Sequence, residues 1–213
     1  MTRLPLLPQR PRLSPLRPVT TARTSLGHDG GRLVLTIEHR TLRGISPEML
    51  LWWFQHIDGT LTVDGLAHPR YLLWHPVDHI QWELASPDPA GGAGAGARFR
   101  IVEAFGGNPD FYVDSVELVE KLDLEGISLV RRELGREVFR LEHRWATVPG
   151  GSSYRSRMVV GATGAVVGRM VNALLRPRIF PDEMGRAWLV HNVEEVGVLE
   201  QLLPALLGDP APG

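Results

Sequence analysis

The feature that most constrains the fold is a run of short β-rich segments that ends in one long apolar helix. Proline, glycine, aspartate or charged breaks divide residues 69–160 into seven such segments: PRYLLWH, HIQWELA, ARFRIVEAF, FYVDSVELVEKL, ISLVRREL, REVFRLEHRWATV and SSYRSRMVV. Short strands separated by turn residues are typical of an antiparallel meander. The final helix is predicted from about Asp182 to Leu207.

The segments ahead of the meander complete the fold prediction. From about Arg32, the run GRLVLTIEHRTL is β-rich, and it is followed by SPEMLLWWFQHI. In the latter, Ser46 can cap a helix whose first position suits Pro47. One strand, a short helix, a curved antiparallel sheet and a long C-terminal helix are the order of an α+β helix-grip fold (Bet v 1-like or START-like). In this fold the sheet wraps the helix and leaves a cavity that can bind a ligand.

The chain is predicted to form one domain behind a tail. Residues 1–25 are rich in proline and arginine, and closely spaced prolines oppose regular structure, so these residues are expected to be a flexible tail. Residues 26–213 show no internal repeat and are expected to be a single helix-grip domain. The stretch GGAGAG, at 91–96, is expected to be a flexible surface connector.

Composition narrows the classes of function. A net charge of -1 gives no overall attraction to nucleic acid, which is therefore not expected as a partner. The chain has 0 cysteines, so any metal must be held by histidine or carboxylate side chains. No apolar run reaches the roughly 20 residues of a membrane span, and no membrane partner is expected. A cytoplasmic location is the default expectation, and assembly as a homodimer stays open.

The final helix carries polar residues on an apolar stripe. At about 100° per residue one face gathers Met184, Trp188, His191, Glu195, Leu199, Leu202 and Leu206. A buried carboxylate is costly unless it is paired, protonated or bound to a metal, so Glu195 requires a partner. His191 and Glu195 are one turn apart and could both reach one ion. The alternative is that they pair with each other at the surface end of the helix.

Alternation along the strands places further polar residues on the inner face of the sheet. Glu103 shares a side with Phe99, Ile101 and Phe105, and His143 shares a side with Phe139, Leu141 and Trp145. Tyr154 likewise shares a side with Met158 and Val160. Each alone could be a satisfied core residue. Together with the helix they place two carboxylates, two imidazoles and a phenol around one space, which is unexpected unless something binds there.

The stretch RYLLWHPVDHIQWE adds two more candidate ligands, His75 and His79, on either side of a proline turn. Strand parity does not choose between them. The other histidines have no partner at a telling distance and are predicted to be surface or structural residues: His28, His39, His56 and His68.

These motifs resemble those of the zinc-dependent 2,4-diacetylphloroglucinol hydrolases and phloretin hydrolases. The resemblance is carried by WWFQHIDG, RYLLWHPVDHIQWE, RIVEAFGG and HNVEE, and it extends from about Arg32 to the last helix. It implies a helix-grip core that binds one Zn²⁺ through two histidines and two glutamates. It also implies hydrolysis of the carbon–carbon bond between an acyl group and a polyphenol ring, with a small aromatic acyl ketone as the substrate.

The resemblance also implies roles for particular residues. It assigns the metal ligands to His79, Glu103, His191 and Glu195. His79 is preferred to His75 because the family has a substrate-binding tyrosine eight residues before this ligand, where Tyr71 stands. By the same resemblance His143 is the candidate acid or base and Tyr154 a second substrate-binding tyrosine. The sequence departs from the family at Trp82, where an asparagine that contacts the substrate is expected, so the particular substrate is open.

Two functions from other classes remain. The first is a binding module, because helix-grip proteins can carry apolar ligands without chemistry and a fold does not imply catalysis. The second is a metal-independent cyclase or isomerase of aromatic polyketides that uses His143 and Tyr154 as acid and base. The set of four ligands makes the hydrolase the preferred interpretation. Two histidines and two carboxylates suit Zn²⁺, with Fe²⁺ or Mn²⁺ as alternatives, and a bound Zn²⁺ can polarise an acyl carbonyl or activate water.

Overall fold

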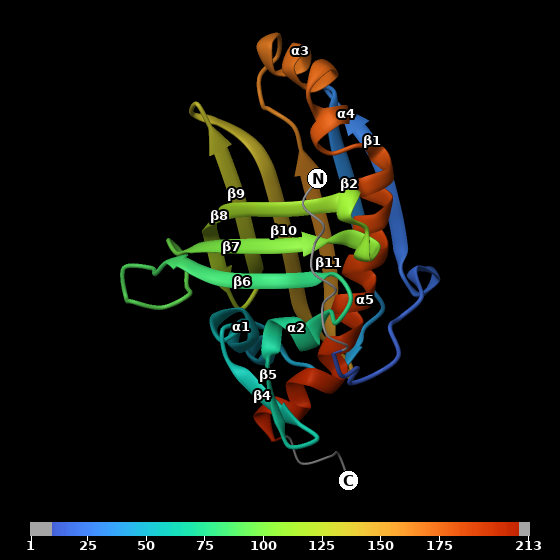
Figure 1. Ribbon diagram of the computed structural model, residues 1–213, viewed down its shortest axis with the longest axis vertical. Helices are drawn as coiled ribbons and strands as arrows, with labels where there is room; N and C mark the ends of the chain where they lie inside the picture. Colours follow the sequence, from blue (N-terminus) through green and yellow to red (C-terminus); the bar gives the residue numbers. More distant parts are fainter. Residues whose placement is uncertain (1–9, 209–213) are drawn as a thin grey trace.

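The computed structural model describes residues 10–208, and an antiparallel sheet dominates it. The strands follow the order β1-β2-β11-β10-β9-β8-β7-β6, and β3 pairs with β11. Their bounds are β1 Arg23–Asp29, β2 Arg32–Glu38, β3 Leu42–Arg43, β6 His79–Ser86, β7 Arg98–Ala104, β8 Tyr112–Asp123, β9 Gly126–Glu133, β10 Arg136–Val148 and β11 Gly151–Val160. The sheet curls, so that β6 to β8 run across the view and β9 to β11 run along its long axis (Figure 1).

Helices close the open side and one end of this curled sheet. The long helix α5 (Asp182–Leu207) runs beside the sheet, with α3 (Val167–Leu174) and α4 (Arg176–Ile179) before it. At the lower end lie α1 (Pro47–Gln55), α2 (Arg70–Trp74) and the hairpin of β4 (Thr60–Val63) and β5 (Leu66–Pro69) (Figure 1). Short 3-10 turns cover Val19–Thr21, Phe105–Gly107 and Pro109–Phe111. The predicted α+β helix-grip fold is confirmed.

Local sequence explains why the gripped helix sits where it does. Strand β2 alternates, with Leu33, Leu35 and Ile37 buried on the side that faces α5. These side chains pack with Met184 and Trp188 of the helix in one hydrophobic cluster. The second half of α5 packs in a separate cluster with residues of α1 and the inner strands. The polar residues of α5 are therefore held between two apolar clusters.

The sequence predicted α1 correctly. The side chain of Ser46 accepts a hydrogen bond from the backbone N–H of Met49, and Pro47 stands at the first position. The helix buries Trp53 and Phe54 beneath the sheet. It thereby closes the lower end of the space between the sheet and α5 (Figure 1).

Three local predictions differ from the structure. PRYLLWH is not a strand: it spans the end of β5 and the helix α2, whose residues Tyr71 and Trp74 point into the core. Strand β1 and the hairpin β4–β5 were not predicted, because their residues alternate only weakly and are mostly exposed.

The predicted flexible tail also differs where it is described. Residues 1–9 of that tail lie outside the described residues. Leu13 and Leu16 pack against the core, Arg17 forms an ion pair with Glu200 of α5, and β1 already begins at Arg23. Prolines prevent regular structure between residues 10 and 18, but they do not prevent packing.

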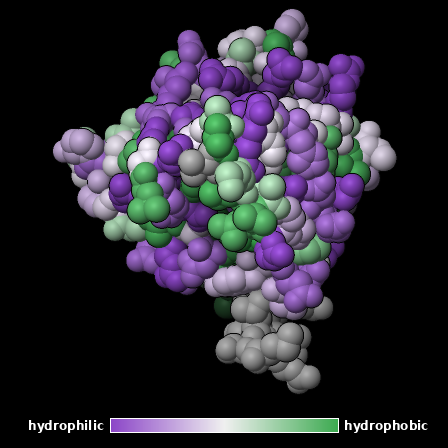
Figure 2. Space-filling view, turned by 90° about the horizontal axis from the view of Figure 1, so that it is seen from above, coloured by the Kyte–Doolittle hydropathy of each residue, from purple (hydrophilic) through white to green (hydrophobic). Residues whose placement is uncertain are grey.

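The end of the molecule that carries α3 is partly apolar. Hydrophobic side chains gather near the middle of this face (Figure 2). The exposed ones of this region are Val166, Met170, Val171, Leu174, Leu175 and Ile179. Among the described residues, no helix combines the length and the apolar character needed to cross a membrane.

Candidate metal centre and cavity

The first histidine of the site, His79, is fixed at the start of β6. Its Nδ1 lies 2.6 Å from the backbone carbonyl oxygen of Tyr71, which can only accept a hydrogen bond. The ring of Tyr71 stacks on the imidazole, with 3.9 Å between ring centroids. Nδ1 therefore carries the proton, and in the neutral ring Nε2 presents a lone pair.

The second histidine, His191, is fixed in the same way from α5. Its Nδ1 lies 3.0 Å from Oδ2 of Asp78, a fully buried carboxylate. Asp78 is itself held by the backbone N–H groups of Gly106 and Gly107, each at 2.9 Å. A carboxylate behind a histidine fixes the tautomer of the ring and is the usual support of a metal-binding imidazole.

Two glutamates face these imidazoles. His79 Nε2 lies 3.4 Å from Glu103 Oε1 and 3.4 Å from Glu195 Oε2. His191 Nε2 lies 3.9 Å from Glu103 Oε2 and 3.7 Å from Glu195 Oε2. The hydroxyl of Tyr71 donates to Glu103 at 2.6 Å, and the amide of Asn192 donates to Glu195 at 2.5 Å. Both carboxylates are thus oriented by neighbours.

The donor set fits a divalent cation. Ligand atoms of His79, Glu103 and His191 all lie within 4.8 Å of one another, and Glu195 joins them through its contacts with both histidines. His79 Nε2 is buried and has no hydrogen-bond partner among residues 10–208. Ligands at about 2.0–2.1 Å from a tetrahedral ion are roughly 3.3 Å apart, close to the observed spacing. Two imidazole nitrogens and two carboxylates converge on one point, which is an arrangement that a metal ion satisfies.

Titration of the ring nitrogens supports this reading. Burial lowers the pKa of His79 to about 4, even though Glu195 acts in the opposite direction. For His191, burial is outweighed by Glu195, Glu103 and Asp78, so its pKa rises to about 9. Burial raises the pKa of Glu103 to about 7. Without a cation, a proton on His191 must balance the carboxylates, and a metal ion would displace it.

The structure separates the two histidines that the sequence left open. His75 turns away from Glu103 and Glu195: its Nε2 lies 3.0 Å from Glu194, and its Nδ1 accepts from the backbone N–H of Asp78. His79 faces both glutamates. The local geometry therefore favours His79 over His75.

The centre forms part of the wall of a cavity of about 240 Å³. The lining is mostly apolar and aromatic, and it includes Glu103, His191 and Glu195 together with Tyr71, Trp82 and His143. A largely apolar cavity with a few convergent polar groups is typical of a site for a small molecule. Its wall reaches Ile179 and Phe180, next to the apolar end of the molecule shown in Figure 2.

Of the remaining predicted site residues, His143 and Trp82 line the cavity and Tyr154 does not. His143 lies on the cavity wall, and its Nδ1 is 2.9 Å from the hydroxyl of Ser156. Burial lowers the pKa of His143 to about 4. Trp82 also faces the cavity, and its buried Nε1 has no partner among the described residues. Tyr154 lies beside His143 on the neighbouring strand β11, with ring centroids 5.4 Å apart, and it is not among the residues that line the cavity.

Comparison with known proteins now places the chain. The model of the DAPG hydrolase PhiG domain matches residues 27–208. The chain belongs to this family. A relative of the chain, the phloretin hydrolase of Eubacterium ramulus, is 23% identical over 201 residues, which cover 85% of this chain and 69% of the relative. The predicted family resemblance is confirmed.

The similar solved structures have a lower sequence identity to this chain than the phloretin hydrolase has. Ara h 8.0201 is 14% identical, with a TM-score of 0.44, and the match covers 78% of this chain and 98% of that one. A START superfamily protein from Mycobacterium smegmatis is also 14% identical, with a TM-score of 0.40 and the same two coverages, 78% and 98%.

The sequence analysis did not predict the two residues that hold His191 and Glu195 in place, Asp78 and Asn192. Asp78 stands directly before His79, and Asn192 directly after His191, so adjacency to a candidate ligand was the available signal. His39 was predicted to be surface or structural, yet its Nε2 lies 3.0 Å from the Ser156 hydroxyl that contacts His143. No sequence pattern joins residues this far apart.

Proposed function

We propose that this protein is a zinc-dependent hydrolase that cleaves the carbon–carbon bond between an acyl group and a phloroglucinol-like ring. The observation that carries the proposal is the convergence of His79, Glu103, His191 and Glu195, three of which line the cavity: Glu103, His191 and Glu195. The family match and the name of the Eubacterium ramulus relative support the reaction class. Two imidazoles and two carboxylates, with no sulfur ligand, suit Zn²⁺.

When bound, Zn²⁺ supplies Lewis acidity toward a carbonyl oxygen and lowers the pKa of water. The chain contributes the environment of that chemistry. Phe105 and Trp74 lie against the imidazoles of His191 and His79, with ring centroids 5.1 and 5.3 Å apart, and keep the ligand side of the site apolar. Glu103 and Glu195 are held in place by Tyr71 and Asn192.

His143 is proposed to move the proton that bond cleavage requires. Hydrolysis adds the elements of water: the acyl carbon gains oxygen, and the ring carbon that loses the acyl group gains a proton. Because burial keeps His143 neutral near pH 7, it acts first as a base, taking a proton from a ring hydroxyl or from water. The negative charge of Glu195 raises the pKa of His143 and so favours the protonated ring that then protonates carbon.

The other candidate residues shape substrate binding in this proposal. The hydroxyl of Tyr71 is engaged by Glu103, so Tyr71 positions a ligand and presents its ring edge to the cavity. Trp82 offers a free buried N–H to a substrate oxygen. Tyr154 lies on the neighbouring strand, where its ring packs beside that of His143 and helps to position it.

Metal content and hydrolysis test the proposal together. Wild-type protein purified without chelator is expected to contain about one zinc per chain by plasma mass spectrometry, and to release a carboxylic acid from an acylphloroglucinol. Glu195→Gln is expected to lose zinc and activity while its circular dichroism spectrum is retained. The matched control is Glu194→Gln on the adjacent position, which faces His75 and should keep the zinc. A folded wild-type protein without metal would favour the binding-module alternative.

A further inference from the structure

A second polar cluster lies in the cavity wall, away from the metal centre. Glu117 of β8 is only 4% exposed and lines the cavity, as do Ser115 and Arg131. The register that pairs Leu118 with Val130 places Glu117 beside Arg131 on the inner face of the sheet. The metal centre and His143 use none of these three side chains.

The cluster has an acceptor and a donor that do not satisfy each other. The hydroxyl of Ser115 donates to Oε1 of Glu117, which leaves Oε2 without a described hydrogen bond. The buried Nε of Arg131 has no hydrogen-bond partner among residues 10–208. Its nearest ion-pair contact there is Glu133 Oε1 at 3.6 Å, beyond hydrogen-bond distance, and Glu117 forms no ion pair with it within 4.0 Å.

A hydroxyl group satisfies such a pair. It can donate its proton to a carboxylate and accept a hydrogen bond from a guanidinium N–H at the same time. A buried carboxylate without full partners costs free energy, and burial raises the pKa of Glu117 to about 7 although Ser115 and Arg131 act against the rise. A ligand that donates a hydrogen bond to the Glu117 carboxylate is therefore expected to bind most favourably at this site.

The position of the cluster indicates which part of a ligand reaches it. In the register of β7 and β8, Glu103 stands opposite Val113 and Phe99 stands opposite Glu117. Glu117 is therefore four residues further along β8 than the partner of Glu103. Phe139 pairs with Arg131, four residues along β10 from His143. Four residues of strand span roughly 13 Å. The cluster is thus a third corner of the cavity, distant from both the metal centre and His143.

From this arrangement we propose that Ser115, Glu117 and Arg131 form a specificity subsite that binds a hydroxyl group at the far end of the acyl chain. The inference rests on the proposed function, in which the ketone lies at the metal centre and its phloroglucinol-like ring toward His143. The acyl chain then extends along the remaining direction, past Phe99 and Leu129 of the lining. Substrates with a long, hydroxyl-terminated acyl group are favoured over those with a short alkyl one.

Two matched ketones test the subsite. Both are 2,4,6-trihydroxyphenyl ketones whose three-carbon acyl chain ends in a phenyl ring, and only one carries a 4-hydroxyl on that ring. The wild type is expected to prefer the hydroxylated ketone by about 10- to 100-fold, the effect of one hydrogen bond to a charged group. The preference is measured as the ratio of kcat/KM if the ketones are hydrolysed, and as the ratio of Kd by calorimetry if they are not.

Glu117→Gln should lower this preference to about 3-fold or less. The kcat/KM or Kd of the ketone without the 4-hydroxyl should stay close to that of the wild type. Glu120→Gln is the matched control, because Glu120 lies on the same strand but pairs with Arg132 and Arg140 on the outer face. Arg131→Met provides a second variant that removes the donor and should also reduce the preference.

The outcomes separate the subsite from the proposed function. A preference that appears in Kd without any hydrolysis supports the subsite and contradicts the proposed function. Hydrolysis of both ketones at equal kcat/KM supports the function and overturns the subsite. An undiminished preference in folded Glu117→Gln, or no binding of either ketone, also overturns it.

Discussion

At the scale of single residues, the decisive feature is the way each proposed ligand histidine uses its two nitrogens. In both rings Nδ1 is engaged by an oxygen, the carbonyl of Tyr71 or the carboxylate of Asp78, and Nε2 faces the glutamates. His75 shows the contrast, since its nitrogens are engaged by Glu194 and the backbone N–H of Asp78. Nε2 faces Glu103 and Glu195 in the two proposed ligand histidines, whereas in His75 it is engaged by Glu194.

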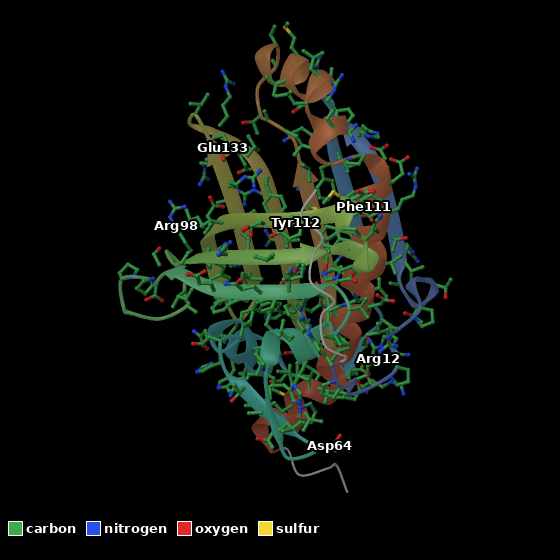
Figure 3. All side chains as sticks on the ribbon, in the orientation of Figure 1. Arg12, Asp64, Arg98, Phe111, Tyr112 and Glu133 are labelled. Atoms are coloured by element: carbon green, nitrogen blue, oxygen red, sulfur yellow. The ribbon has the colours of Figure 1, made fainter. Side chains whose placement is uncertain are left out.

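Asp78→Asn tests this residue-scale reading. The amide can still accept from the His191 N–H, but it lacks the charge that strengthens that hydrogen bond, so zinc affinity should fall by about 10- to 100-fold. Competition with a chromophoric chelator measures the change. Asp64→Asn is the control, because Asp64 lies in the turn between β4 and β5 at the opposite end of the molecule from α3 (Figure 3). Unchanged affinity in Asp78→Asn would contradict a supporting role.

At the scale of secondary structure, the close packing of α5 against β2 sets the position of His191 and Glu195. Gly185 is the contact point: a Cβ built there would lie 3.0 Å from Cδ2 of Leu33 and 3.4 Å from Cδ2 of Leu35. A larger residue would push the helix away from the sheet. The ligands on the helix depend on this approach because their partners stand on β6 and β7.

Gly185→Val should therefore destabilise the protein by about 1–3 kcal/mol through overpacking, although valine is the better helix former. Urea unfolding followed by circular dichroism measures the free energy of unfolding. Gly27→Val is the matched control, since a Cβ at Gly27 of β1 meets nothing within 4 Å. Equal stability of the two variants would show that α5 can shift without cost.

At the scale of the whole molecule, the proline-rich N-terminal segment acts as part of the domain from residue 10 onward. Arg10 donates to the backbone carbonyl of His79, and Arg17 pairs with Glu200 near the C-terminal end of α5. Leu13 and Leu16 pack against the larger hydrophobic cluster. The segment thereby connects the strand that begins with His79 to the helix that carries His191, the two proposed ligand histidines.

Replacing both Leu13 and Leu16 with alanine should lower the free energy of unfolding by about 2 kcal/mol, because each loses apolar contacts that are partly buried. Thermal unfolding monitored by calorimetry measures the loss as a lower Tm. Leu66→Ala is the control, since Leu66 is 66% exposed. If the double variant melted like the wild type, the segment would behave as the flexible tail that its composition predicts.

The sequence by itself determined the order of the main elements and the inward side of the strands that carry Glu103, His143 and Tyr154. Periodicity is a local property, so the strands carrying Glu103 and His143 and the helix carrying His191 could be predicted without the fold. The family resemblance was likewise readable from short motifs. The weakly alternating β1 and the hairpin β4–β5 left no comparable local signal.

Only the tertiary structure decided which side chains meet. The different surroundings of His75 and His79, the hydrogen bond of Asp78 to His191, and the place of Glu117 beside Arg131 all depend on contacts between different elements. The same holds for the N-terminal segment, whose prolines exclude regular structure but not packing. The physical reason is that hydrogen-bond partners and burial are set by distance in space, which curvature of the sheet and the approach of α5 determine.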